Sequence, residues 1–352
     1  MTGTAELLYN RDINGVYYIN ANQTTPNSAF VGADNRPRWT TVSCNITLPQ
    51  SATNCANRIY GNVANAVVLK NQNIGKSWHV SAALEKAFKG GFIKAGYSYG
   101  EAKNTVDPGS IAFGSWSGNA HSSNPNTPGL GYGANSPGHR FFIGASVAKE
   151  YLKFGKTTFG IFWQGIQGNG SYTVSGDLNN DGTSGNDLIY IQNSASETTF
   201  VPFTASGKTF TAAEQAQAWD AYISQDKYLS KHRGQYAVRN AVFLPIVRQA
   251  DVSISQDLFR DLGGKRHSLQ FRVDILNAAN LLNKDWGLGS RFVNAQPLII
   301  ASTAQGGPIS AAGAPQFTMR AVNGVLMTKS FEPTAGIGDV YRIQFALKYN
   351  FN

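Results

Sequence analysis

The C-terminal end of the chain alternates between apolar and polar residues without a break. Apolar side chains occupy every second position, and polar or small ones lie between them. The apolar set is Tyr341, Ile343, Phe345, Leu347, Tyr349 and Phe351, and the other set is Arg342, Gln344, Ala346, Lys348 and Asn350. Successive side chains of a β-strand point to opposite faces of a sheet, so this pattern predicts a strand with one apolar face. Its length matches a strand that crosses a membrane at a tilt.

The same period of two recurs elsewhere and predicts antiparallel strand pairs joined by short glycine-containing turns. The three clearest pairs are 77–85 with 93–100, 141–147 with 159–163, and 252–258 with 269–275. A weaker pair is expected around Asp12-Ile13-Asn14-Gly15, between a strand at Ala5 to Tyr9 and one at Tyr17 to Ile19. These segments predict a chain made mainly of β-strands.

Short and long connections alternate between the predicted strands. Short ones lie near 10–15, 89–91, 152–156 and 260–265, and long ones near 22–75, 105–137, 170–249 and 280–339. Outer-membrane barrels have short turns at one end and long extracellular loops at the other. We therefore expect an all-β fold, a partial antiparallel transmembrane β-barrel with long extracellular loops. The count is nine crossing strands, an odd number that predicts a further part of the barrel upstream.

Three features of the long connections predict local structure. Thr211-Ala212-Ala213-Glu214 matches a capping box and predicts a short helix that ends near Gly234. Small strands are expected at 64–68 and 297–303, with a buried turn segment as the alternative for 297–303. Cys44 and Cys55 both lie in the first long connection, where an exported protein would pair them in a disulfide. Two unpaired thiols are the alternative.

A possible calcium loop lies in the third long connection. Asp177, Asn179 and Asp181 place oxygen ligands at positions 1, 3 and 5, and Gly182 allows the turn at position 6. Position 12 is Leu188, so the bidentate glutamate of such loops is absent. A series of Asx turns without an ion is the alternative. Calcium is the one cofactor that the sequence suggests.

Composition excludes several classes of protein. The sequence has no run of about 18 apolar residues, which excludes a membrane-crossing helix and a hydrophobic signal sequence. Only 14% of the residues are charged, against roughly 25% in soluble domains. The net charge of +9 is scattered instead of forming a basic patch, so no nucleic-acid partner is expected. No catalytic histidine spacing or nucleophile elbow is present, so we expect no enzyme activity.

Several groups of residues occur in a distinctive order. They are Gly176 to Gly182 followed by Asn186 to Tyr190, then Tyr228-Leu229-Ser230, Arg233-Gly234, Arg239-Asn240, Pro245 and Asp251, then Asp274 to Gly287, and finally the last strand. Together they cover half to two-thirds of the chain and resemble the Oar-like TonB-dependent transporters, which are outer-membrane barrels of Gram-negative bacteria.

The resemblance implies a transporter or receptor of the cell outer membrane that moves or binds an unidentified ligand. Such barrels have about 22 strands around an N-terminal plug. Residues 1–352 resemble only the C-terminal segment of the barrel, without the plug and the signal peptide. The implied partners are outer-membrane lipid, the barrel-assembly machinery, the TonB complex through the missing N-terminal part, and the ligand. Tyr349 and Phe351 would form the assembly signal.

The alternation also predicts which side chains meet lipid and which face the lumen. The lipid-facing set is Trp78, Phe141, Phe159, Phe271, Phe345 and Leu347, and the lumen-facing set is Glu85, Asp274, Arg342 and Lys348. A soluble or surface-exposed β-sandwich that binds glycans is the alternative, because aromatic strands and polar loops suit it as well. A small passive porin is disfavoured by the odd strand count.

Overall fold

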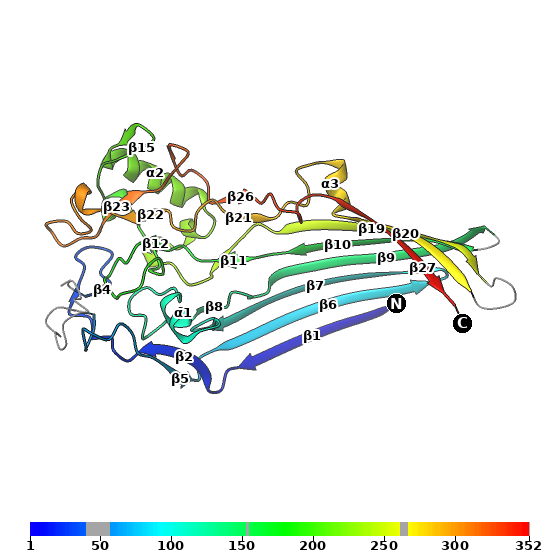
Figure 1. Ribbon diagram of the computed structural model, residues 1–352, viewed down its shortest axis with the longest axis horizontal. Coiled ribbons are helices and arrows are strands. Elements are labelled where there is room, and N and C mark those ends of the chain that lie inside the picture. The colour runs from blue at the N-terminus through cyan, green and yellow to red at the C-terminus, as the bar shows by residue number, and fades with distance from the viewer. Residues whose placement is uncertain (40–56, 153–154, 261–266, 352) are drawn as a thin grey trace.

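The computed structural model describes residues 1–39, 57–152, 155–260 and 267–351 (Figure 1). The chain is mostly β-structure, which confirms the predicted β fold. Eight long antiparallel strands form one open sheet with β1 and β27 at its two edges. In sheet order they are β1 (Thr2–Arg11), β6 (Lys76–Phe88), β7 (Gly91–Asn104), β9 (Gly138–Leu152), β10 (Gly155–Ile166), β19 (Val247–Arg260), β20 (Ser268–Leu276) and β27 (Arg342–Asn350). The short β8 (Gly131–Tyr132) pairs with the end of β7.

The register of the sheet gathers the apolar positions on one face. One row runs across five neighbouring strands through Val147, Phe159, Ile254, Val273 and Phe345. All six side chains predicted to meet lipid lie on this face, which we call the apolar face, and the four predicted to face the lumen lie on the opposite, polar face. The two sets are thus separated as the alternation predicts.

The first strand pairs differently from the sequence prediction. Tyr17 and Ile19 lie in β2 (Gly15–Asn20), which pairs with β5 (Val67–Gln72) and not with β1. β1 instead pairs with β6 over ten residues, with Leu7 opposite Val80. β2 has only six residues, so it could form a shorter hydrogen-bond ladder with β1 than β6 does. The apolar positions of β6 also lie opposite those of β1. The short connection after Arg11 is present, but the expected pairing across it and the count of nine crossing strands are wrong, and the eight long strands are an even number.

The long connections lie at one end of the sheet and the short turns at the other (Figure 1). Together the described residues of 12–75, 105–137, 167–246 and 277–341 form what we call the loop unit. Its helices are α1 (Ala112–Ser117), α2 (Ala212–Gln225) and α3 (Ala278–Leu282). Its other paired strands are β3 (Ser28–Ala29) with β4 (Pro37–Arg38), β11 (Asn169–Gly170) with β18 (Val242–Phe243), β13 (Tyr190–Ile191) with β17 (Gln235–Tyr236), β15 (Phe203–Ala205) with β16 (Lys208–Phe210), β21 (Ser290–Phe292) with β26 (Phe331–Pro333), and β24 (Ala321–Val322) with β25 (Val325–Leu326).

A four-stranded sheet lies inside the loop unit. Its order is β12 (Val174–Ser175), β22 (Leu298–Ile300), β23 (Gln316–Met319) and β14 (Thr199–Phe200). The strand expected at 297–303 is therefore present as β22. The strand expected at 64–68 begins later, at Val67, because the register with β2 starts there.

The buried apolar core lies in the loop unit. Among the described residues, every buried apolar side chain falls outside the eight long strands. Trp219, Tyr222 and Ile223 on α2 pack with Tyr172 and Met319, and all five are almost completely buried. Burying apolar surface is the main favourable term in folding. The connections thus form a folded unit with its own core.

The helix α2 begins at the predicted capping box. Thr211 Oγ1 accepts the amide of Glu214 at 3.2 Å, and the Glu214 carboxylate accepts the amide of Thr211 at 2.7 Å. The helix ends at Gln225 and not near Gly234, because Asp226 is extended and its carboxylate accepts the amides of Tyr228 and Leu229. None of the helices in the described segments has the length and apolar character needed to cross a bilayer.

Candidate functional site

The acidic loop singled out in the sequence lies between β12 and β13 in the loop unit. Asn180 and Gly182 have positive φ angles of 60° and 95°, which turn the chain back on itself. A glycine at the second of these positions avoids the steric cost of a side chain in that conformation. The amide of Gly185 donates to the carbonyl of Gly176 at 2.8 Å and closes the loop.

Asp177 and Asn179, two of the three predicted calcium ligands, hold the amides of Asp181 and Gly182. Asp177 accepts the amide of Asp181 at 3.1 Å and that of Gly182 at 3.0 Å, one on each carboxylate oxygen. Asn179 Oδ1 also accepts the Asp181 amide, at 3.1 Å. These are the Asx-type contacts that the sequence gives as the alternative to an ion. Calcium at Asp177, Asn179 and Asp181 stays a prediction.

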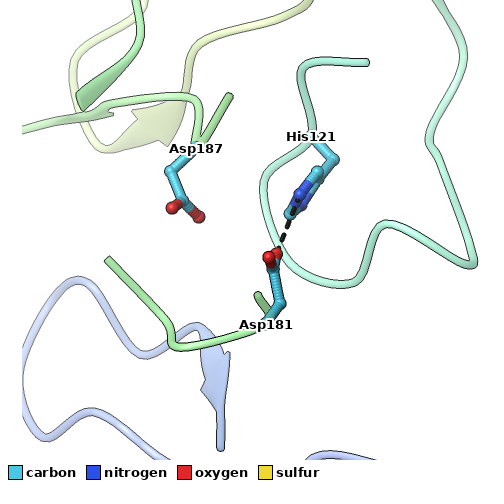
Figure 2. Close-up of side chains that lie close together, drawn as sticks. All are labelled: His121, Asp181 and Asp187. Atoms are coloured by element: carbon cyan, nitrogen blue, oxygen red, sulfur yellow. Dashed lines mark ion pairs between the residues drawn. The ribbon is translucent and has the colours of Figure 1, made fainter. Parts of the chain in front are cut away.

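The third predicted ligand, Asp181, points to His121, which is not part of the calcium-loop pattern. One carboxylate oxygen accepts the amide of Thr183 at 2.7 Å and its hydroxyl at 2.5 Å. The other lies 3.1 Å from His121 Nε2, although the two atoms lack the alignment of a hydrogen bond. Figure 2 shows the two side chains pointing toward each other. Both are almost completely buried.

His121 reaches the acidic loop from the second long connection. Its amide donates to the carbonyl of Asn186 at 3.0 Å, and its carbonyl accepts the amide of Leu188 at 2.8 Å. These bonds place the imidazole beside Asp187. Neither ring nitrogen has a hydrogen-bond partner in the part of the chain that the structure describes. One ligand atom from each of His121, Asp181 and Asp187 lies within 4.8 Å of the others, which is a spacing that suits a metal ion.

Asp187 is oriented by two further groups. One carboxylate oxygen accepts the amide of Leu178 at 2.9 Å, and the other lies 3.3 Å from Arg36 Nη1. Arg36 also pairs with Asp34 at 2.9 Å and donates to the carbonyl of Leu188 at 2.7 Å. Burial raises the pKa of Asp187, and the opposite charges of Arg36 and His121 act to lower it. Segments from three long connections therefore meet at this carboxylate.

The cluster holds more acidic groups than basic ones. Four carboxylates, those of Asp34, Asp177, Asp181 and Asp187, lie around the Arg36 guanidinium and the His121 ring. Burial raises the pKa of Asp177 to about 8, and the charges of Asp181 and Asp187 add to that increase. Buried carboxylates without compensating charge are costly. The arrangement favours either bound protons or a bound cation.

The other predicted site residues have different outcomes. Cys44 and Cys55 lie outside the described residues. Tyr349 and Phe351 lie on the apolar face at the C-terminal end, where their rings stack with centroids 5.9 Å apart. The Tyr349 hydroxyl contacts His267 Nδ1 at 2.8 Å. His121 and Arg36 carry no sequence signal, because they lie far from the acidic loop in the chain and join it only through tertiary contacts.

Comparisons with protein-family models, with curated proteins and with solved structures give no match for this chain.

Proposed function

We propose that this chain is the C-terminal part of a TonB-dependent outer-membrane transporter barrel of the Oar-like type. In this proposal the eight long strands cross the outer membrane and the loop unit stands outside the cell. The apolar face of the sheet carries the proposal, because its side chains are large, contiguous and exposed.

The apolar face has no protein partner among the described residues. Leu7 is 72% exposed, Phe345 is 68% exposed and Leu347 is 67% exposed. The largest apolar patch on a typical soluble monomer covers only about 300–600 Å², whereas this face extends over eight strands. Lipid is the environment in which such a face is stable.

Charged side chains are arranged as a membrane strand requires. On the apolar face Lys86 lies near the short-turn end and Glu101 near the loop-unit end, and the positions between them on β6 and β7 are uncharged. On the polar face Lys94 pairs with Glu85 at 3.3 Å and Arg272 pairs with Asp274. A barrel lumen accepts such pairs, whereas lipid does not.

The edges of the sheet support a larger barrel. In a bilayer an unpaired strand edge leaves amide and carbonyl groups without partners, at a cost of several kcal/mol each. β1 and β27 each pair on one side only among the described residues. We propose that further strands of the transporter pair with these edges. The long strands also form one sheet and not two facing sheets, which disfavours the β-sandwich alternative.

The loop unit is the part that would meet ligand first. It combines a packed core with many Asn, Ser and Gly residues, and the buried contacts of that core hold its shape. Binding groups held on a rigid scaffold lose less conformational entropy when ligand binds. This proposal assigns the ligand to the outer end of the barrel.

Cell fractionation tests the membrane part of the proposal. Cells making the full-length protein should retain it in the outer membrane after an alkaline carbonate wash. Protease added to intact cells should cut within 105–137 or 167–246 and not at the turn after Phe88. Release by carbonate, or cleavage at that turn from outside, would contradict the proposal.

A growth comparison tests the transport part. A strain lacking this protein and a strain lacking TonB should share a growth defect on the same limiting nutrient. If the strain lacking this protein shows a growth defect and the strain lacking TonB does not, transport does not depend on TonB. That result would leave the proposed membrane location unaffected.

A further inference from the structure

The cluster of His121, Asp181 and Asp187 can hold a metal ion in a way that the calcium motif does not predict. We propose that these three residues bind a divalent transition-metal ion of the Zn²⁺ type, which joins the second and third long connections. The proposal is independent of the transport function, because it concerns the folded loop unit alone.

Unpartnered atoms aimed at one point are the first argument. Asp181 Oδ2 and His121 Nε2 are buried, and neither has a hydrogen-bond partner among the described residues. Buried polar atoms are nearly always satisfied by protein, water or an ion. The Asp181 oxygen and His121 Nε2 face each other at 3.1 Å (Figure 2). An ion bound by both atoms would satisfy them together.

The second argument is that neighbouring groups hold the carboxylate ligands in position. The remaining oxygen of Asp181 is held by Thr183, and Asp187 is held by the amide of Leu178 and by Arg36. Outer partners of this kind fix the orientation of metal ligands and tune their basicity. The backbone bonds of His121 to Asn186 and Leu188 hold the segment that carries its ring. The two carboxylate ligands are thus oriented before any ion arrives.

The chemistry of the ligands selects the ion. Imidazole with carboxylates suits zinc and related first-row metals, whereas calcium takes oxygen ligands. The oxygens of Asp177 and Asn179 face amides of their own loop, whereas Asp181 Oδ2 faces the imidazole nitrogen of His121. The excess of carboxylates over basic groups in the cluster favours a cation of charge +2 over a neutral ligand.

Metal binding to the full-length protein, purified in detergent without a histidine tag, tests the proposal. After treatment with EDTA, the protein should take up one Zn²⁺ per chain from a competing chelator and much less Ca²⁺. His121→Gln and Asp181→Asn should each weaken Zn²⁺ binding by about 100-fold or more, since even second-shell changes cost 10- to 100-fold. The matched controls His232→Gln and Asp285→Asn, which lie elsewhere in the loop unit, should stay within about threefold of the unaltered protein.

Cobalt gives a measurement that does not depend on the folding of any variant. Co²⁺ added to the unaltered protein should produce visible absorption, and Zn²⁺ should displace it. Absence of stoichiometric Zn²⁺ or Co²⁺ binding would overturn the proposal. Tight Ca²⁺ binding that His121→Gln leaves unchanged would also overturn it, and would place an oxygen-only site at Asp177, Asn179 and Asp181.

Discussion

A charge placed on the apolar face of β27 should destabilise the barrel, and the same charge on the polar face should not. Phe345 is the residue to change, because it lies midway between Tyr341 and Tyr349 on the last strand. Eight residues span about 27 Å along a strand, or about 19 Å across a membrane at a tilt of 45°. Aromatic residues gather at the two interfaces of outer-membrane barrels. Phe345 therefore lies near the middle of the apolar band.

The expected cost follows from this depth. Arginine on the lipid face near the midplane costs about 2–4 kcal/mol, which corresponds to about a 30- to 900-fold change in the folding equilibrium. Gln344→Arg is the matched control, because Gln344 lies on the polar face opposite Asp274. A polar-face substitution of this kind should change stability by no more than about 0.5 kcal/mol.

Urea unfolding in lipid vesicles measures the difference. The full-length protein and the two variants are refolded into vesicles of one composition and followed by tryptophan fluorescence and by heat-modifiable migration on gels. Phe345→Arg should lower the unfolding free energy by 2–4 kcal/mol as estimated from the cost of a lipid-facing arginine, whereas Gln344→Arg should follow the unaltered protein. Equal effects of the two variants would show that the two faces of β27 meet similar surroundings, and the reasoning from the apolar face would fail.

Three further predictions concern the end of the chain, the acidic loop and α2. Phe351→Asp should reduce the amount of barrel assembled in the outer membrane while Asn350→Asp has less effect, and equal amounts would remove the assembly role of the aromatic end. Because burial raises the pKa of Asp177 from 3.8 to about 8, the metal-free loop unit should lose stability as pH rises from about 4 to about 8. Asp177→Asn should reduce this pH dependence in amide hydrogen exchange, because Asp187 also has a raised pKa and keeps part of it, and an unchanged slope would contradict the prediction. Thr211→Ala should cost about 1 kcal/mol by removing the cap, which exchange rates along α2 would show.

The local residue pattern was sufficient to predict the long strands and to show that the sheet has one apolar and one polar face. Period-two alternation identifies all eight long strands with their apolar face, because a strand's side chains alternate whatever lies beside it. The capping box at Thr211 likewise predicts the start of α2, since Thr211 and Glu214 interact within one helical turn. The end of α2 was predicted too late, because it depends on Asp226 and its contacts outside the helix.

Strand pairing at the N-terminal end was decided by the tertiary structure. Alternation shows that Ala5 to Tyr9 and Tyr17 to Ile19 are strands, but it does not say which strand pairs with which. β1 pairs with β6, a longer strand more than sixty residues away, and β2 pairs with β5. Pairing between distant segments depends on the whole ladder, so the nearest strand in sequence is not always the partner.

The sequence alone determined the acidic loop, because its oxygen ligands and its glycine lie within a few residues of one another. It could not determine that Asp181 turns toward His121, or that Arg36 reaches Asp187 from 151 residues away. Those contacts form only when three long connections pack together around a shared core. Ligands contributed by separate segments leave no spacing pattern in a sequence, so only the folded chain brings this cluster together.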